Sequence, residues 1–381
     1  MFIKGVGCIP YRIYDKKSHL LAYDAIMNCL DDADTNMNKI DAVVCSTLEW
    51  FYTGEFQRHA SSLLSATLKT RIPIIRTPGA CAGGGTALWT AKKLMENSEF
   101  NNILVVGFEK LFGHTNNSGK VLDEFMMAME SRWEQAEGIN APASAALVAN
   151  EYFQKFPEAT TDDLALIALK NHENGFKNPN ALFFNKKITL EQIKSSPIVA
   201  SPLRKFDCSI SADGAAACIL TKDKTDIKLV GSGYIADYLP PFERENCSTW
   251  SGTTISSKEA LKEAGIELSD VDFAELHDAF SIIEMISYED LGFCKKGEAY
   301  KLVRDGYFKL DGKVPINASG GLKAKGHPVS ATGIGMAYEI TKQLRGECKD
   351  RQISNAKIGL LHNIGGTGCT TACHIFKKIG G

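Results

Sequence analysis

The feature that most constrains the fold is an internal repeat, because the chain presents the same succession of strands and helices twice. Residues 3–7 (IKGVG) restart as residues 227–231 (IKLVG), and each segment precedes a helical period and a short apolar strand. Later in each half, a helix that begins with glycines precedes another apolar strand, at 103–107 and 358–361. This shared spacing indicates a duplication with a boundary near residue 225.

The alternation of strands and helices predicts an α/β fold with two pseudo-symmetric halves of the βαβαβ type. Short apolar strands in such an alternation are typical of mostly parallel sheets covered by helices. We expect residues 1–110 and 206–225 to form the N-terminal half, and residues 226–381 the C-terminal half. Residues 111–205 have no counterpart in the second half, and their polar, mixed sequence predicts an inserted loop or cap region over the site.

Composition limits the classes of function. The 381 residues carry a formal net charge of -2, which gives no reason to expect nucleic acid or a membrane as partner. No run reaches the roughly 18 apolar residues of a membrane span, and the N-terminal segment lacks the apolar core of a signal peptide. Eleven cysteines, none of them in a CxxC, favour reduced thiols in a cytoplasmic protein. Cys369, Cys373 and His374 alternate with small residues as a buried strand would, so we expect packing there and no metal.

Two loops that start equivalent helices are expected to meet, since a pseudo-two-fold axis brings helix N-termini together. TPGACAGGG carries Cys81, and SGGLKAKGHPVSATG carries His327. The N-terminus of a helix favours a thiolate, so we expect a lowered pKa and a reactive thiol at Cys81. His327 could take the thiol proton and then donate a hydrogen bond to an oxyanion. Taken singly, a buried packing cysteine and a structural histidine explain these residues as well.

Polar residues at two further strand ends point to the same place. His277 and Asp278 follow an apolar strand, at the carboxyl end where α/β sheets bind ligands. His362 and Asn363 end the last apolar run, and the glycines that follow leave backbone N–H groups available for an oxyanion hole. For each of these side chains, a buried and hydrogen-bonded structural role is the alternative. Four such features on one duplicated scaffold favour an active site.

These blocks resemble the thiolase superfamily. The resemblance is carried by GACAGG, ELHDAF, NASGGLKAKGHPVSATG and HNIGGTG, and GFEK, KNH and DCSISADGAAA extend it over essentially the whole chain. The archaeal acetyl-CoA acetyltransferase (acetoacetyl-CoA thiolase) branch looks most similar, and that branch is related to sterol-carrier-protein-type thiolases. The resemblance implies the thiolase fold, a layered α-β-α-β-α arrangement of the two halves with an inserted loop or cap domain.

For chemistry, the resemblance implies a Claisen condensation in which two acetyl-CoA molecules give acetoacetyl-CoA and CoA, or the reverse cleavage. It implies that Cys81 is acylated, that His327 activates it and stabilises the enolate, and that His277 helps to hold the oxyanion. A second oxyanion hole would be formed by backbone N–H groups of Cys81 and of the turn at Ile364, Gly365 and Gly366. No separate cofactor is expected, because coenzyme A thioesters are the substrates.

The chain departs from the family pattern at the second catalytic cysteine. Many thiolases place it just before the final glycine turn, where this chain has His362. Sterol-carrier-type relatives place it inside the HDxF block, where this chain has Ala279. We therefore expect His362 or His277 to deprotonate the second acetyl group.

Partners follow partly from charge and partly from the resemblance. Basic residues in or beside the inserted region could meet the phosphates of coenzyme A, although a solvated surface explains them as well; these are Lys186, Lys187, Arg204 and Lys205. The resemblance implies a homodimer or a dimer of dimers, a role in the mevalonate pathway, and a complex with a 3-hydroxy-3-methylglutaryl-CoA synthase and a zinc-containing OB-fold bridging protein.

Other functions remain open at this point. The chain could be an acyl-CoA-binding scaffold subunit with little activity of its own, since the usual second cysteine is missing. It could be a thiolase that acts on longer 3-ketoacyl-CoA substrates. A ketoacyl synthase or a retro-aldolase on the same fold is a further alternative, but a retro-aldolase would not require Cys81.

Overall fold

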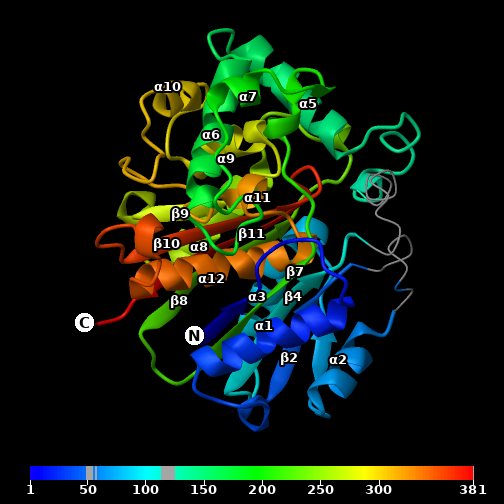
Figure 1. Ribbon diagram of the computed structural model, residues 1–381, viewed down its shortest axis with the longest axis vertical. Helices are drawn as coiled ribbons and strands as arrows, with labels where there is room; N and C mark the ends of the chain where they lie inside the picture. Colours follow the sequence, from blue (N-terminus) through cyan, green and yellow to red (C-terminus); the bar gives the residue numbers. More distant parts are fainter. Residues whose placement is uncertain (49–54, 56–57, 113–124, 381) are drawn as a thin grey trace.

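The protein is described by a computed structural model that covers residues 1–48, 55, 58–112 and 125–380, and its main element is a mixed nine-stranded sheet (Figure 1). The strands, in chain order, are β1 (Phe2–Cys8), β2 (Ala42–Ser46), β3 (Ile74–Arg76), β4 (Asn102–Glu109), β7 (Gly214–Thr221), β8 (Ile227–Ala236), β9 (Phe273–Leu276), β10 (Ile358–Gly365) and β11 (Thr370–Lys378). A separate hairpin pairs β5 (Ile198–Ala200) with β6 (Leu203–Arg204).

Helices cover the sheet on both faces and build the inserted region. They are α1 (Ser18–Asp32), α2 (Ala60–Leu68), α3 (Gly83–Glu96), α5 (Ala141–Lys155), α6 (Thr161–Phe176), α7 (Leu190–Lys194), α8 (Ser251–Ala264), α9 (Ser281–Leu291), α10 (Ala299–Arg304), α11 (Gly321–Ala324) and α12 (Thr332–Arg345). Within the described ranges, no helix combines the length and the apolar character that crossing a bilayer requires.

The two halves of the sheet repeat one strand order. The order β2-β4-β7-β1 in the first half corresponds to β9-β10-β11-β8 in the second, and β1 pairs with β8 where the halves meet. An isolated parallel bridge between Ala274 of β9 and Ile316 stands where β3 pairs with β2 in the first half. The fold is therefore the duplicated α/β arrangement that the repeat predicts.

The sheet is mixed rather than mostly parallel, which corrects the expectation from the sequence. The strand β2 is parallel to β3 and β4, and β9 is parallel to β10. The pairs β4–β7, β7–β1, β1–β8, β8–β11 and β11–β10 are antiparallel. Parallel neighbours need a crossover connection, whereas antiparallel neighbours can be joined by a tight turn, as β10 and β11 are. Both kinds of strand are apolar because helices cover both faces of the sheet, so the sequence pattern does not reveal strand direction.

Helices α3 and α12 form a central layer between the two halves. Helix α3 packs on β2 and β4 of its own half and on β8 and β11 of the other, while α12 packs on β10 and also on β7 and β1. Along β4, Val105 lies in the core with α3 and α12, whereas Leu104 and Val106 pack against α1 on the opposite face. The two halves of the sheet thus lie on either side of α3 and α12, and each half forms one β layer. With α1 and α8 outside, the layers run α-β-α-β-α.

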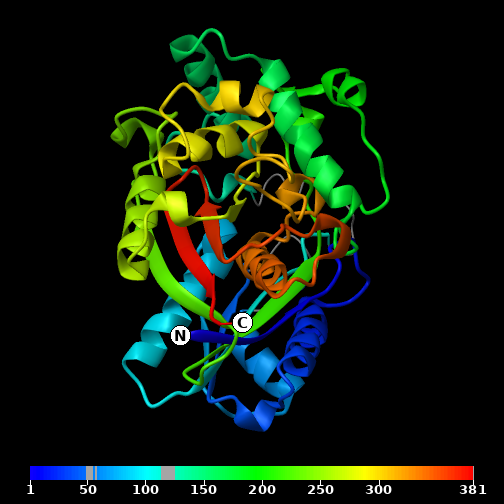
Figure 2. The ribbon, with the colours of Figure 1, turned by 90° about the vertical axis from the view of Figure 1, so that its left-hand side faces the viewer.

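The inserted region gathers at one end of the molecule. Figure 1 shows α5, α6 and α7 next to α9 and α10, above the sheet, while α1 and α2 lie at the opposite end. The view turned by 90° shows the same separation (Figure 2). Helix α6 contacts both α9 and α11 of the second half, so the inserted region is packed against the C-terminal half.

Candidate active site

A cavity of about 500 Å³ lies where the two halves and the inserted region meet. Its wall is mostly apolar, with aromatic side chains from several segments. The reacting groups expected from the sequence are among the polar lining residues, namely Cys81, His277 and His327. Cavities of this size and character are typical of sites for small molecules.

Cys81 sits on a strained turn at the start of α3. The 3-10 turn η2 (Ala80–Ala82) precedes the helix, and Ala80 has a φ of 45°, a left-handed conformation that costs free energy in a residue with a side chain. The turn aims the Cys81 side chain out of the helix and toward the cavity. Strain of this kind is common where a backbone must present a reacting group.

His327 is held by its backbone and by one ring nitrogen. Its N–H donates to the carbonyl of Ile210 at 2.8 Å, and its Nδ1 lies 2.8 Å from the hydroxyl of Thr332 at the start of α12. Its Nε2 is buried and has no hydrogen-bond partner among the residues that the structure describes. Burial lowers the pKa of His327 to about 3, so the imidazole is neutral. In the tautomer whose Nδ1–H donates to the Thr332 hydroxyl, Nε2 carries the lone pair and can act as a base.

His277 follows β9 and is oriented by Asn363. The Asn363 amide donates from Nδ2 to the carbonyl of Cys81 at 2.9 Å, and its Oδ1 accepts the N–H of Gly85 at 3.0 Å. These two bonds fix the amide so that Nδ2 faces Nδ1 of His277 at 3.3 Å. Because an N–H faces Nδ1, the proton of the neutral ring belongs on Nε2. Burial, and then the neighbouring His327 and His362 rings, hold the pKa of His277 well below its usual range.

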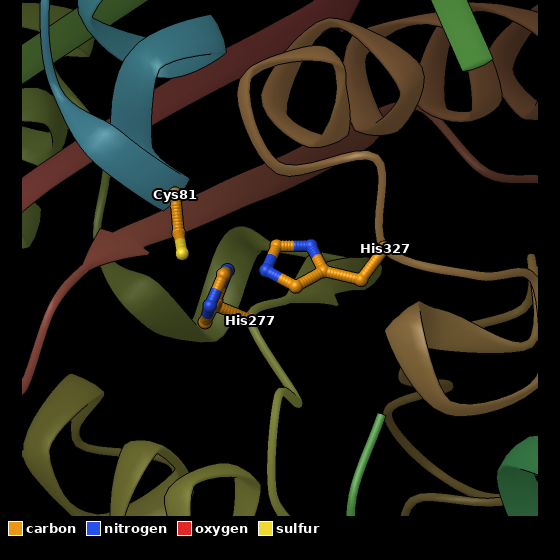
Figure 3. A group of neighbouring side chains, drawn as sticks. All are labelled: Cys81, His277 and His327. Carbon is orange, nitrogen blue, oxygen red and sulfur yellow. The ribbon is translucent and has the colours of Figure 1, made fainter. Parts of the chain in front are cut away.

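The structure brings Cys81, His277 and His327 together. The Cys81 sulfur and one nitrogen of each ring lie within 4.8 Å of one another. Figure 3 shows the Cys81 side chain pointing from the start of α3 toward the two imidazole rings, which come from the other half of the chain. A thiol and two imidazoles at this spacing could also ligate a soft metal ion. The proton that Asn363 places on Nε2 of His277 disfavours that use, because a metal ligand needs a bare nitrogen.

The pKa of Cys81 corrects one expectation from the sequence. The helix start was expected to lower it, but burial raises the pKa of Cys81 to about 12. A hydrogen bond from the backbone of Gly366 acts in the opposite direction, and the nearby Glu109 and Cys369 add to the rise. The cost of placing a charge in an apolar cavity exceeds the effect of the short turn that precedes α3. The thiol therefore needs a base to release its proton.

His362 and Asn363 lie side by side on β10 but face opposite ways, as neighbours on a strand do. The structure does not bring His362 into the cavity: its Nε2 lies 3.0 Å from the hydroxyl of Thr253 on α8, and burial lowers its pKa to about 3. Asn363 is the residue that reaches Cys81 and His277. Sequence reasoning noted Asn363 but gave it no role, because alternation along a strand shows that the two side chains face opposite ways but not which one meets the cavity.

The glycine turn after β10 reaches the site at one residue. Gly366 lines the cavity beside Cys81 and has a φ of 59°, which favours glycine. Gly365 lies so close to the backbone of the Cys81 turn that a Cβ would stand 2.5 Å from the carbonyl oxygen of Gly79. Ile364 packs into the core on the C-terminal half. Of the expected turn residues, Gly366 is the one whose backbone meets the thiol.

The basic residues expected to bind coenzyme A lie in different surroundings. Lys205 lines the cavity. Lys186 lies over the ring of Phe183, which is also in the cavity wall, at 5.8 Å from the ring centroid. Arg204 donates to the carbonyl of Ser196 at 2.9 Å, and Lys187 is exposed on the surface. The structure thus brings Lys205 to the cavity, with Lys186 near its rim.

Comparisons with known proteins agree with this geometry. Residues 10–224 match the family described as "Thiolase, N-terminal domain" and residues 240–378 match "Thiolase C-terminal domain-like". An acetyl-CoA acetyltransferase of Methanothermobacter thermautotrophicus is 36% identical over 96% of this chain and 96% of its own. A sterol carrier protein 2 of Bos taurus is 30% identical over 96% of this chain and 70% of its own.

Solved structures show the same fold at lower identity. The chain named "Ltp2-ChsH2(DUF35) aldolase" superposes with a TM-score of 0.84 at 21% identity, over 99% of this chain and 97% of that one. An acetyl-CoA acetyltransferase from Syntrophomonas wolfei superposes with a TM-score of 0.74 at 18% identity, over 99% and 98%. The fold and the relatives together define an enzyme of the acyltransferase class. The chain belongs to the thiolase family.

Proposed function

We propose that the protein is an acetoacetyl-CoA thiolase, which condenses two acetyl-CoA molecules to acetoacetyl-CoA and CoA through an acetyl group on Cys81. The observation that carries this proposal is the meeting of the Cys81 thiol with two neutral imidazoles within 4.8 Å in one apolar cavity. The matching acetyl-CoA acetyltransferase of Methanothermobacter thermautotrophicus supports acetyl-CoA as the substrate.

In the first step, Nε2 of His327 takes the thiol proton while the sulfur of Cys81 attacks the thioester carbonyl. The backbone N–H of Gly366, which favours the anionic form of the neighbouring thiol, is in place to bind the developing oxyanion. The coenzyme A thiolate leaves and takes the proton from His327, so the ring returns to its neutral form. Proton transfer to a neighbouring base makes a thiol of high pKa reactive without a stable thiolate.

In the second step, Nε2–H of His277 binds the carbonyl oxygen of the incoming acetyl-CoA and stabilises its enolate. His327, again neutral, is the base that takes the proton from the methyl group. The enolate carbon attacks the acetyl carbonyl on Cys81, a carbon–carbon bond forms, and the Cys81 sulfur leaves and recovers the proton from His327. This assignment replaces the earlier expectation that His362 or His277 is the second base, since His277 is a donor and His362 contacts Thr253 on α8.

The test is intact mass after mixing the protein with acetyl-CoA, with Cys81→Ala and His327→Ala alongside. An adduct of one acetyl group that is lost in Cys81→Ala, together with acetoacetyl-CoA in the same tube, supports the proposal. The absence of an adduct with acetyl-CoA and with longer 3-ketoacyl-CoA substrates overturns it and favours the acyl-CoA-binding scaffold. An adduct only with longer substrates favours a thiolase of longer chains, for which a cavity of about 500 Å³ has room.

For partners, we propose a homodimer and a complex with a 3-hydroxy-3-methylglutaryl-CoA synthase and a zinc-containing OB-fold protein, in the mevalonate pathway of the cytoplasm. Support comes from the similar aldolase, whose name includes a DUF35 component. An exposed aromatic pair also supports a partner, because Trp133 is 61% and Phe242 60% exposed, with ring centroids 5.9 Å apart. Light scattering of the protein alone and with the two partners tests the assembly.

A further inference from the structure

The cavity carries a second group of polar side chains to which the proposed reaction gives no role. His172 of α6 and Lys323 of α11 line the same wall as Cys208. Both side chains are almost fully buried, at 2% and 1% exposed. Buried polar groups that line an apolar cavity normally fix the orientation of a ligand.

His172 offers a ring nitrogen without a partner. Its Nδ1 is buried and makes no hydrogen bond within the described ranges of the chain. Phe183 and Phe206 hold the ring edge to face, with centroids at 4.5 and 5.3 Å, so packing limits how far the ring can turn to find one. Burial and the charge of Lys323 lower the pKa of His172 to about 4. The ring is therefore neutral, and leaving its nitrogen unbonded costs stability unless a ligand supplies a partner.

Lys323 offers a buried cation with donors to spare. Its Nζ donates to the carbonyl of Asp207 at 2.6 Å, and it forms no ion pair within the part of the chain that the structure describes. An ammonium group has three N–H donors, of which this contact uses one. Burial lowers the pKa of Lys323, while Asp278 and Asp207 act to raise it. The other two N–H donors are available to a further acceptor, and Lys323 is among the residues that line the cavity.

The charges around Lys323 favour a neutral acceptor over an anion. Asp278, Asp207 and Glu284 all act on Lys323, and the second ammonium of the group, Lys170, pairs with Glu284 at 2.7 Å. Three carboxyl groups thus stand against two ammonium groups before any ligand binds. Another negative charge would add to this excess, whereas a carbonyl oxygen would not.

The position of the group sets its distance from the reacting atoms. The segment Cys208–Ser211 forms a bridge with Phe280 at one end and with His327 at the other. Three residues of extended chain span at most roughly 10 Å. Lys323 contacts the carbonyl of Asp207, and His172 packs on the ring of Phe206, so both side chains lie just before this segment, on the side away from His327.

We propose that Lys323 and His172 form a subsite for a neutral carbonyl oxygen of the bound thioester, away from the carbonyl that reacts with Cys81. This inference rests on the proposed function, because it takes thioesters as the substrates. Two parts of such a substrate carry that chemistry: an amide of the pantetheine arm of coenzyme A, and a keto group on a longer acyl chain.

The test compares Lys323→Met and His172→Phe with the wild-type protein in the acylation of Cys81, followed by mass spectrometry. Lys325→Met is the matched control, since Lys325 is also buried on this loop and also donates to a backbone carbonyl, that of Gly335, but does not line the cavity. With acetyl-CoA or acetoacetyl-CoA we expect kcat/KM to fall about 10- to 100-fold in Lys323→Met, mainly through KM, as for the loss of a hydrogen bond to a charged donor. Lys325→Met should stay within about two-fold of wild type, well inside the effect of one hydrogen bond.

Thioesters without the pantetheine arm show which of the two carbonyl groups, the pantetheine amide or the keto group of the acyl chain, binds the subsite. S-ethyl thioacetate has no amide and no keto group, and S-ethyl acetothioacetate adds the keto group alone. A defect that disappears with both compounds assigns the subsite to a pantetheine amide. A defect that returns with S-ethyl acetothioacetate assigns it to the acyl chain. Unchanged kcat/KM on both coenzyme A substrates in Lys323→Met and His172→Phe overturns the proposal, and His172→Phe decides alone if Lys323→Met does not fold.

Binding without reaction keeps this inference separate from the proposed function. If the wild-type protein takes no acyl group at all, the proposed function fails, but titration with the thioethers S-ethyl-CoA and S-acetonyl-CoA still tests the subsite. A Kd about 10-fold higher in Lys323→Met, equivalent to about 1.4 kcal/mol, supports it. If Lys323→Met binds each of the two thioethers with the same Kd as the wild-type protein, the proposal is overturned.

Discussion

Cys81 and His327 stand at the starts of two equivalent helices, yet the chain holds them in different ways. The turn before α3 is short, and its backbone, with φ of 45° at Ala80, aims the thiol, while the single side chain of Asn363 bonds the carbonyl of Cys81 and the N–H of Gly85. The stretch before α12 is long and contains α11, whose N–H groups at Leu322 and Lys323 donate to the buried Asp278 carboxylate. A duplicated scaffold can thus place one reacting group by main-chain geometry and the other by a network of side chains.

The network around the second loop is buried and continuous. Asp278 also accepts from the Asn171 amide at 2.7 Å, and that amide donates in turn to Glu284. A side chain at Gly321 would collide with the Asp278 carboxylate, and its φ of 58° favours glycine as well. The loop therefore depends on groups from α6, α9 and the end of β9, whereas the Cys81 turn depends on few side chains.

The largest effect is expected at Cys81, on the turn before α3. Cys81→Ala removes the proposed nucleophile, so the rate of condensation should fall by about 10⁴-fold or more, as for other covalent catalysts. The thermal unfolding temperature should change little, because the side chain packs only partly into a small apolar cluster. Activity of acetyl transfer and thermal unfolding are the measurements. Residual condensation near the wild-type rate would contradict the role of Cys81.

The next largest effect is expected at the Asn363 amide, which contacts both Cys81 and His277. Asn363→Asp places an acceptor where Nδ2 now faces Nδ1 of His277, so the ring proton should move to Nδ1 and leave Nε2 bare. We expect a loss of condensation of about 10²- to 10³-fold, as for the loss of an oxyanion donor. His362→Asn on the other face of β10 is the comparison, and it should lower stability more than it lowers kcat. Equal loss of kcat in both variants would contradict the roles assigned here.

A smaller effect is expected from loosening the second loop. Asp278→Ala removes an acceptor of two backbone N–H groups, so the free energy of unfolding should fall by about 3 kcal/mol and condensation by about 10-fold. Asp272→Ala is a matched control, since exposed Asp272 accepts from the N–H groups of Lys357 and Ile358. The control should cost about 1 kcal/mol and leave kcat unchanged. Urea unfolding and steady-state rates distinguish the two.

The pH profile should show neither the Cys81 thiol nor the His327 imidazole titrating near its ordinary pKa. The reacting pair is a thiol with a pKa of about 12 and an imidazole with a pKa of about 3. His327 stays neutral as the pH falls through the ordinary histidine pKa of about 6.5, and Cys81 stays protonated as it rises through about 8.5. The kcat/KM of acylation should therefore be flat over this interval. A limb near either ordinary value would contradict these shifts.

The smallest effect is expected at the surface. Lys205→Ala should raise KM for acetyl-CoA by about two- to five-fold at low salt, and the effect should shrink as ionic strength rises. Lys187→Ala, nearby but outside the cavity wall, should leave KM unchanged. Steady-state kinetics at two salt concentrations measures both. A larger increase of KM in Lys187→Ala than in Lys205→Ala would show that the phosphates of coenzyme A do not bind at Lys205.

The sequence allowed the duplicated fold and the pairing of Cys81 with His327 to be predicted, because repeats and helix starts leave local patterns. It could not show strand direction, since both kinds of strand here are covered on both faces. It pointed to His362 rather than Asn363, because alternation along β10 gives two faces but does not say which one meets the cavity. The helix-based expectation for the Cys81 pKa was wrong because burial depends on segments far away in the chain.

The amide of Asn363 has a mechanical consequence. It joins the carbonyl of Cys81, the N–H of Gly85 and the ring of His277, which belong to different halves of the chain. A slip of one half against the other would misplace the nucleophile and shift the imidazole proton at the same moment. Both steps of the proposed reaction therefore depend on this one side chain, and we expect a motion that breaks its hydrogen bonds to stop both of them.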